Sequence, residues 1–148
     1  MNHLKMKELH IGGLKIKLPI IQGGMGVGIS MSGLAGAVAN EGGIGVIASA
    51  GIGMLEPDYA KNFIEANIRA LKKEILKARE LTNGVLGVNI MVALTNFADL
   101  VNTAISEGID IIFSGAGLPL NLPQFFTSVP LKMIVTEQVR RIVNWDRC

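Results

Sequence analysis

The sequence has few of the residues that disulfides and metal sites require. It contains one cysteine, Cys148, and two histidines, His3 and His10, which both precede the first apolar run typical of a buried strand. A disulfide framework needs paired cysteines, and a structural metal site needs clustered ligands. Neither can be drawn from these residues, so we expect no metal site in this chain.

An excess of charge of one sign is also missing. The chain has 14 basic and 12 acidic residues, and they are spread along it without a basic stripe. A surface that neutralises nucleic-acid phosphates needs such a stripe, so nucleic acid is not the favoured partner. The apolar content of 49% in 148 residues is enough for the core of one domain.

No apolar run is long enough and pure enough for a membrane span. The stretch between Lys17 and Glu41 carries no charge, but Pro19, several polar residues and many glycines interrupt it. A spanning helix needs about 20 predominantly apolar residues. Gly24 and Gly28 do match the small-xxx-small spacing of transmembrane dimers, which is a weak argument. Lysines in the first 17 residues break up any secretory signal, so we expect a cytoplasmic protein without a membrane partner.

Short apolar runs alternate with segments of helical periodicity along the chain. Strands are expected at 9–11, 14–16, 18–22, 44–48, 85–91, 110–114 and 131–135, and helices at 32–40, 57–81, 96–107 and 136–145. The first two strands flank Gly12-Gly13 and predict a hairpin that acts as a plug or lid. Strands separated by helices imply an α/β fold with parallel pairing and right-handed crossovers.

Two local expectations concern the helices. Ser30 or Ser32 is expected to cap the helix at 32–40, because both can accept a hydrogen bond from its first turn. On the helix at 57–81, the basic group of Lys72, Lys73, Lys77 and Arg79 is expected to form the solvated face.

Three glycine-containing segments stand at the ends of expected strands, at 22–28, 87–91 and 114–119. The carboxyl ends of parallel strands share one rim, where such folds keep their sites. Glycine lets backbone approach a flat ring or a phosphate, and Asn89 offers both a donor and an acceptor. Tight turns also demand glycine, so a purely structural role is favoured for each loop taken singly.

The glycine spacing argues against a nucleotide-binding fingerprint. The first loop has glycines at 24, 26 and 28, which is not the dinucleotide pattern, and the chain has no Gly-Lys-Ser or Gly-Lys-Thr phosphate loop. Gly43, Gly45 and Ala48 fit the relaxed fingerprint. In the dinucleotide-binding motif, however, the glycines follow a strand and precede a helix, whereas here they precede an apolar strand. Both matches are discounted.

Four motifs occur in order at strand or helix junctions: PIIQGGM at 19–25, EGGIGVI at 41–47, GVNIM at 87–91 and SGAGxP at 114–119. Together they resemble the nitronate monooxygenase and 2-nitropropane dioxygenase family, which is related to the flavin-dependent enoyl-acyl-carrier-protein reductases. The resemblance runs from about Lys7 to Pro123 and covers the N-terminal portion of the family pattern.

The resemblance implies an incomplete TIM-type (β/α) barrel with about five of the eight βα units, holding FMN at the carboxyl ends of its strands. Carried over by position, Gly23, Gly24 and Met25 would contact the flavin ring through backbone atoms. Asn89 would hydrogen-bond the cofactor, and Gly115 would lie beside it. The implied activity is FMN-dependent oxidation of alkyl nitronates with dioxygen, and the alternative is reduction of an enoyl thioester. Either substrate is a small molecule.

The chain also departs from the family. The family's catalytic histidine belongs to a Gly-Gly-His motif, and no histidine follows His10. The glycine loops that would hold the flavin phosphate are missing too, and residues 124–148 diverge from the pattern within the single partial domain expected over 1–148. We therefore assign no catalytic residue and expect the chain to be truncated and inactive alone. An alternative of another class is a non-catalytic fragment, or a half barrel that self-associates through its exposed edges.

Overall fold

A four-stranded parallel sheet organises the computed structural model, which describes residues 6–117, 120, 122–125 and 132–136. Its strands are β3 (Gly45–Ala48), β4 (Leu86–Met91), β5 (Ile111–Gly115) and β6 (Lys132–Thr136). They lie side by side in chain order, and each neighbouring pair is parallel. The register places Asn89 opposite both Ala48 and Phe113, so these three residues form a row across the sheet.

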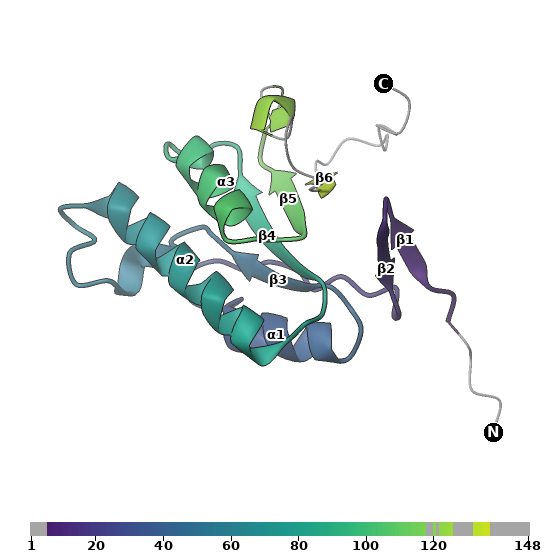
Figure 1. The fold of residues 1–148 in the computed structure, drawn as a ribbon. Coiled ribbons are helices and arrows are strands. Elements are labelled where there is room, and N and C mark those ends of the chain that lie inside the picture. The colour runs from purple at the N-terminus through teal and green to yellow at the C-terminus, as the bar shows by residue number, and fades with distance from the viewer. Residues whose placement is uncertain (1–5, 118–119, 121, 126–131, 137–148) are drawn as a thin grey trace.

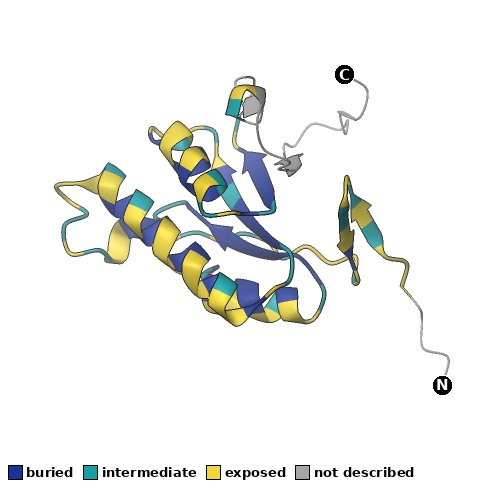
Figure 2. Ribbon diagram, in the orientation of Figure 1, coloured by how far each residue is buried: buried dark blue, intermediate teal, exposed yellow. Residues whose placement is uncertain are grey.

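Helices cover one face of this sheet. They are α1 (Ser32–Asn40), α2 (Phe63–Leu81) and α3 (Phe97–Ser106). Two short 3-10 helices lie elsewhere in the chain: η1 (Ile52–Leu55) between β3 and α2, and η2 (Leu122–Phe125) between β5 and β6. Figure 2 shows the buried stripe of each α-helix turned toward the buried strands. Along β4, Leu86, Val88 and Ile90 join the helical side chains in the larger core cluster. Alternate residues of a strand face opposite sides, so Gly87 and Asn89 face away from the helices.

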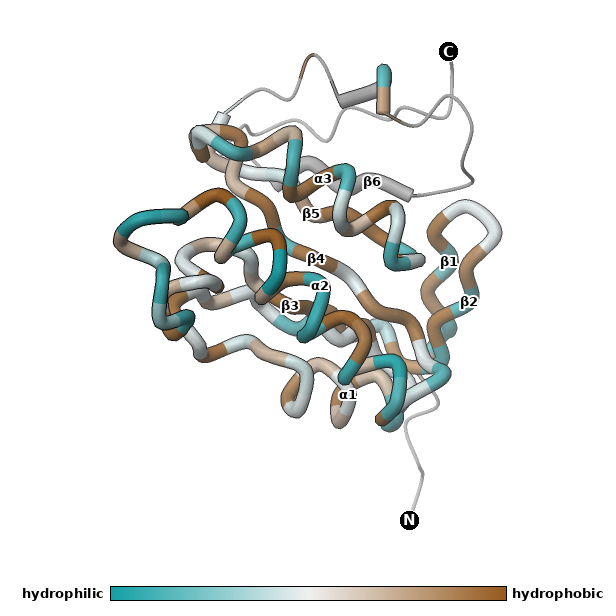
Figure 3. The backbone as a smooth tube through the Cα atoms, turned by 60° about the vertical axis from the view of Figure 1, so that its left-hand side comes forward, coloured by the Kyte–Doolittle hydropathy of each residue, from teal (hydrophilic) through white to brown (hydrophobic). Residues whose placement is uncertain are grey.

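The opposite face is covered at one end by the hairpin β1 (Leu9–Ile11) and β2 (Leu14–Ile16), which pair antiparallel as expected. Gly12 adopts a φ of 56° in the turn. Ile16 is buried in a second cluster with Ile44 and Ile111, which lie at the beginnings of the strands. The hairpin therefore closes the amino-terminal end of this face. Figure 3 shows β3, β4 and β5 as largely apolar segments, whereas α2 alternates between apolar and polar residues.

Most expected elements are present, with shifted boundaries. The helix at 32–40 has the expected bounds, the helix expected from 57 begins at Phe63, and the strand expected at 131–135 is β6. Residues 57–61 form turns, in which the N–H groups of Lys61 and Asn62 both donate to the Asp58 carbonyl at 2.9 Å. The Asp58 carboxylate also accepts hydrogen bonds from the side chains of Asn62 and Arg69. The helix expected at 136–145 lies outside the described residues, except Thr136, which ends β6.

The strand expected at 18–22 is reduced to a single parallel bridge between Ile21 and Ile44. Pro19 has no N–H to donate, and the N–H of Ile20 donates locally to the carbonyl of Leu18 at 2.7 Å. The segment still lies against the edge of β3, because Ile44 N–H donates to Ile20 at 2.9 Å.

The expectation that Ser30 or Ser32 caps α1 is wrong. Met31 occupies the N-cap position, and no side chain of the cap residue bonds to the helix. The N–H of Ser32 instead donates to Glu74 Oε2 of α2 at 3.0 Å. Burial alone would raise the pKa of the Glu74 carboxyl, but the hydrogen bonds from Ser32 and the nearby Lys77 ammonium outweigh it and hold the pKa below its ordinary 4.5.

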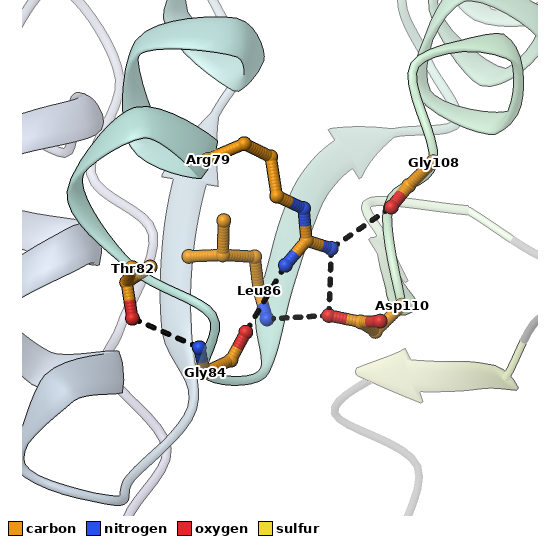
Figure 4. A network of polar contacts seen from close by, with 6 residues as sticks. All are labelled: Arg79, Thr82, Gly84, Leu86, Gly108 and Asp110. Carbon is orange, nitrogen blue, oxygen red and sulfur yellow. Dashed lines mark hydrogen bonds and ion pairs between the residues drawn. The ribbon is translucent and has the colours of Figure 1, made fainter.

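Arg79 does not belong to the solvated face of α2, although the three lysines grouped with it are exposed. Its guanidinium donates to the carbonyls of Gly84 at 3.0 Å and Gly108 at 2.8 Å, and it pairs with Asp110 at 2.8 Å (Figure 4). Asp110 also accepts the N–H of Leu86 at 2.8 Å. These contacts join the end of α2 to the beginnings of β4 and β5, which identifies Arg79 as a structural anchor.

The observed architecture is thus a mixed α/β fold with a parallel sheet, as expected from the alternation of elements. Within the described ranges, no helix is both long and apolar enough to cross a bilayer. The domain boundaries and the divergence after residue 124 stay predictions.

Candidate cofactor site

A cavity of about 320 Å³ lies on the face of the sheet opposite the described helices, and it borders the cluster that the hairpin covers, because Val46 and Phe113 belong to both. Its lining residues are uncharged and come from the first glycine loop and from three neighbouring strands: Ile21, Gln22, Gly23, Gly24, Val46, Asn89 and Phe113. The ring of Phe113 occupies space that a side chain at Gly87 would fill, because a Cβ there would lie 2.5 Å from Phe113 Cε2. Gly87 therefore allows an aromatic side chain to form part of the cavity wall.

Gln22 attaches the first glycine loop to the sheet through its side chain. Its Nε2 donates to the Val46 carbonyl at 3.0 Å, and the Val46 N–H donates to its Oε1 at 3.2 Å. The Gln22 backbone N–H still donates to Ile44 at 3.0 Å. The carboxamide thus provides hydrogen-bond partners for the N–H and carbonyl of Val46 at the edge of β3, in place of main-chain groups. The main chain after Gln22 can therefore turn away from β3 and place Gly23 and Gly24 over the cavity.

Asn89 connects the second loop to the first. Its Nδ2 donates to the Gly24 carbonyl at 3.2 Å. Its own carbonyl accepts hydrogen bonds from the N–H and the hydroxyl of Ser49 at 3.0 and 2.9 Å, which hold the strand end in place. Within the described part of the chain, no group donates to Asn89 Oδ1, so this acceptor is available to a ligand in the cavity.

Two adjacent glycines of this loop are required for different reasons. A Cβ on Gly24 would lie 2.7 Å from Asn89 Cβ and 2.9 Å from Asn89 Nδ2, so packing alone excludes a side chain there. A Cβ on Gly23 would meet nothing within 4 Å, and its φ lies outside the left-handed region. Neither packing nor backbone conformation within the described structure requires glycine at position 23.

The structure brings Gly23, Gly24 and Asn89 to the cavity, but not the other two predicted residues. Met25 is 65% exposed and does not line it. Gly115 is the buried last residue of β5, where its carbonyl accepts the N–H of Val92 at 2.8 Å. The binding roles of all five stay predictions.

Sequence reasoning missed three residues that shape this site. Gln22 was recognised only as the first residue of a loop, and Phe113 only as part of a strand. Ser30 was assigned to a helix cap, whereas its hydroxyl contacts the glycine loop. The polarity of Gln22 within an apolar run is the one signal that the sequence offered, because a buried amide needs partners.

Comparison with known proteins identifies the family. The family model described as nitronate monooxygenase matches residues 7–116. This chain belongs to that family. The enzymes of the family are flavin-dependent oxidoreductases that act on small molecules.

Among solved structures, the chain is similar to FabK from Thermotoga maritima, with 32% identity and a TM-score of 0.64. The match covers 81% of this chain and 34% of that one. A point mutant of the same protein gives the same identity and TM-score and is covered over 35% of its length. The chain therefore spans about a third of the length of these relatives. None of the curated proteins matches it.

The residues that line the cavity fit part of a flavin. The bare backbone at Gly23, the apolar walls of Val46 and Phe113, and the available oxygen of Asn89 suit a flat ring with a polar edge. Among the described residues, no cationic side chain lines this cavity, so it offers no charged partner for a phosphate. The fit is to the ring alone.

Proposed function

We propose that this chain supplies the flavin-ring part of the site of an FMN-dependent oxidoreductase resembling nitronate monooxygenase. The whole protein would oxidise alkyl nitronates with dioxygen. The observation that carries the proposal is the open face of Gly23 at the mouth of a cavity that Asn89 also lines. The cytoplasmic location and the small-molecule substrate expected from the sequence are part of this proposal.

The arrangement of the sheet supports the barrel that this function requires. The strands run in chain order, and the three α-helices described lie on one face (Figure 1). A doubly wound sheet has helices on both faces and reverses its strand order, whereas a (β/α) barrel keeps chain order with helices outside. The described strands would form part of such a barrel, with the cavity on its inner face, lined by the middle of β3, β4 and β5 and by the loop that follows Ile21.

Bound FMN would supply the two-electron redox chemistry. The backbone at Gly23 would let the ring approach closely, and Asn89 Oδ1 would accept a hydrogen bond from it. Gln22 and Val46 would hold the loop while the ring binds. No histidine follows His10, so we assign no proton-transferring residue to these 148 residues.

Two alternatives have specific support. A flavin-dependent enoyl-acyl-carrier-protein reductase is favoured by the similarity to FabK, an enzyme of that activity. A non-catalytic fragment that self-associates is favoured by the edge beside β3, where Ile20 and Ile21 are 49% and 43% exposed. An uncovered apolar sheet edge favours association with another chain.

One experiment separates these functions. Residues 1–148 are purified, FMN is added, and the visible absorbance and elution volume are recorded. A bound-flavin spectrum supports the proposal, and turnover of propionate 3-nitronate against an enoyl thioester with a nicotinamide donor then distinguishes the two enzymes. Colourless, aggregated protein would reject flavin binding by this chain and favour the fragment.

A further inference from the structure

The peptide bond between Gly23 and Gly24 joins two residues without a Cβ, and on its Gly23 side no neighbouring atom restricts its plane. Gly23 has open space around its Cα, and glycine populates a wide range of backbone conformations. Rotation of this peptide plane would exchange the positions of its C=O and N–H. Its orientation is therefore determined by hydrogen bonds and by the packing of Gly24 against Asn89.

Ser30 supplies the shorter of two hydrogen bonds to the Gly23 carbonyl, from a position that is only 2% exposed. The other donor is Gln22 Nε2, at 3.4 Å. The Ser30 hydroxyl donates to the Gly23 carbonyl at 3.2 Å and accepts the Met25 N–H at 3.0 Å. The backbone of Ser30 is fixed in turn, because its N–H donates to Met25 at 2.9 Å and its carbonyl accepts the N–H of Ala48 in β3 at 2.9 Å. One hydroxyl thus connects both sides of the glycine pair to the sheet.

This contact also determines where the next N–H points. The structure has no cis peptide among its described residues, and in a trans peptide the C=O and N–H point in opposite directions. Because the Gly23 carbonyl points toward Ser30, the Gly24 N–H points away from it. No group in the described ranges accepts this N–H, and Gly24 lines the cavity.

We propose that Ser30 is a positioning residue that fixes the Gly23–Gly24 peptide so that the Gly24 N–H is presented to the cofactor ring. Asn89 supports the same geometry on the other side by holding the Gly24 carbonyl. A fixed donor beside the ring stabilises the negative charge that a flavin gains on reduction. The ligand part of this inference rests on the proposed function, whereas the fixed peptide does not.

The test compares Ser30→Ala and Ser30→Cys with Thr103→Val. The cysteine variant keeps the size of serine but donates and accepts only weakly. The control removes another buried hydroxyl, one that donates to the Asp99 carbonyl within α3 at 2.7 Å, away from the cavity. Amide NMR without ligand reports on the peptide directly. Both Ser30 variants should shift or broaden the Gly24 and Met25 amides by exchange, and Thr103→Val should leave them unchanged. An unchanged, single Gly24 amide in folded Ser30→Ala or Ser30→Cys would overturn the fixed peptide.

FMN titration and the reduction potential of bound FMN test the ligand part. Loss of one fixed donor should weaken FMN binding about tenfold and make the potential more negative in both Ser30 variants. The control should match wild type in both measurements. Equal potentials in wild type and Ser30→Ala would overturn the presented donor. If wild type binds no FMN, the proposed function and the ligand part both fail, and the amide spectra still decide whether Ser30 fixes the peptide.

Discussion

Gly23 and Gly24 provide the sharpest test of the cofactor site, because alanine should have opposite consequences at the two positions. At Gly23, a Cβ meets nothing within 4 Å and the backbone is in a region open to alanine. Gly23→Ala should therefore leave the fold intact and stabilise it by about 0.4–1 kcal/mol, because the unfolded chain loses freedom. At Gly24, a Cβ would lie 2.7 Å from Asn89 Cβ, and overpacking of this kind costs about 1–3 kcal/mol.

Alanine at Gly23 is expected to be harmless for stability but harmful for FMN binding. If the flavin ring lies against its bare backbone, the added methyl group must displace the ring, at a cost of about 1–3 kcal/mol. That corresponds to a roughly 5- to 150-fold increase in the Kd for FMN. Gly24→Ala should weaken FMN binding as well, but only together with a loss of stability.

Urea unfolding of both variants and FMN titration by flavin fluorescence measure the two effects separately. The expected pattern is a stable Gly23→Ala protein that binds FMN poorly. A Gly23→Ala protein with wild-type affinity for FMN would show that no ring approaches this residue. The assignment of the cavity to the flavin would then be refuted.

Three further predictions follow from side-chain contacts. Arg79→Met should lower the free energy of unfolding by about 1.5–3 kcal/mol without changing FMN affinity, because the hydrogen bonds to a charged group are lost at the end of the sheet far from the cavity. Gln22→Met should lower stability by about 1–3 kcal/mol and also weaken FMN binding, because the N–H and carbonyl of Val46 lose their partners beside the cavity. The depressed pKa of Glu74 stabilises the fold at pH values above its ordinary 4.5, and this contribution is lost as the pH falls through the lower folded-state pKa. Unfolding measured from pH 7 to pH 3 should show this loss in wild type, and Glu74→Gln should reduce it while weakening the contact with Ser32 N–H by about 1 kcal/mol at neutral pH.

Exposed residues on the same helix provide the controls. Lys73→Met changes a solvated side chain of α2 and should alter stability by less than about 0.5 kcal/mol. An Arg79→Met protein as stable as Lys73→Met would contradict the anchoring role. A pH profile of Glu74→Gln that matches wild type would show that other carboxylates cause the acid sensitivity.

Much of the fold could be predicted from the sequence because its signals are local. Apolar runs predicted β3, β4 and β5, and helical periodicity predicted α2 and α3. Each of these patterns indicates the buried face of one element and lies within the segment that forms it. The Gly12-Gly13 turn similarly predicted the hairpin. The rim that gathers Gly23, Gly24 and Asn89 followed from parallel topology, because strand ends in such a sheet share one edge.

Tertiary structure alone decided which side chains are partners. Arg79 and Asp110 lie 31 residues apart, and the contact between Ser32 and Glu74 spans 42, so no local pattern distinguishes them from a solvated lysine or a helix cap. Ser30 looked like a cap because serine often precedes a helix, but the loop folds back and places its hydroxyl between Gly23 and Met25. The sequence by itself determined the order of the elements and the family. The folded chain decided which polar groups meet, because hydrogen bonding depends on distances that exist only after the elements have packed.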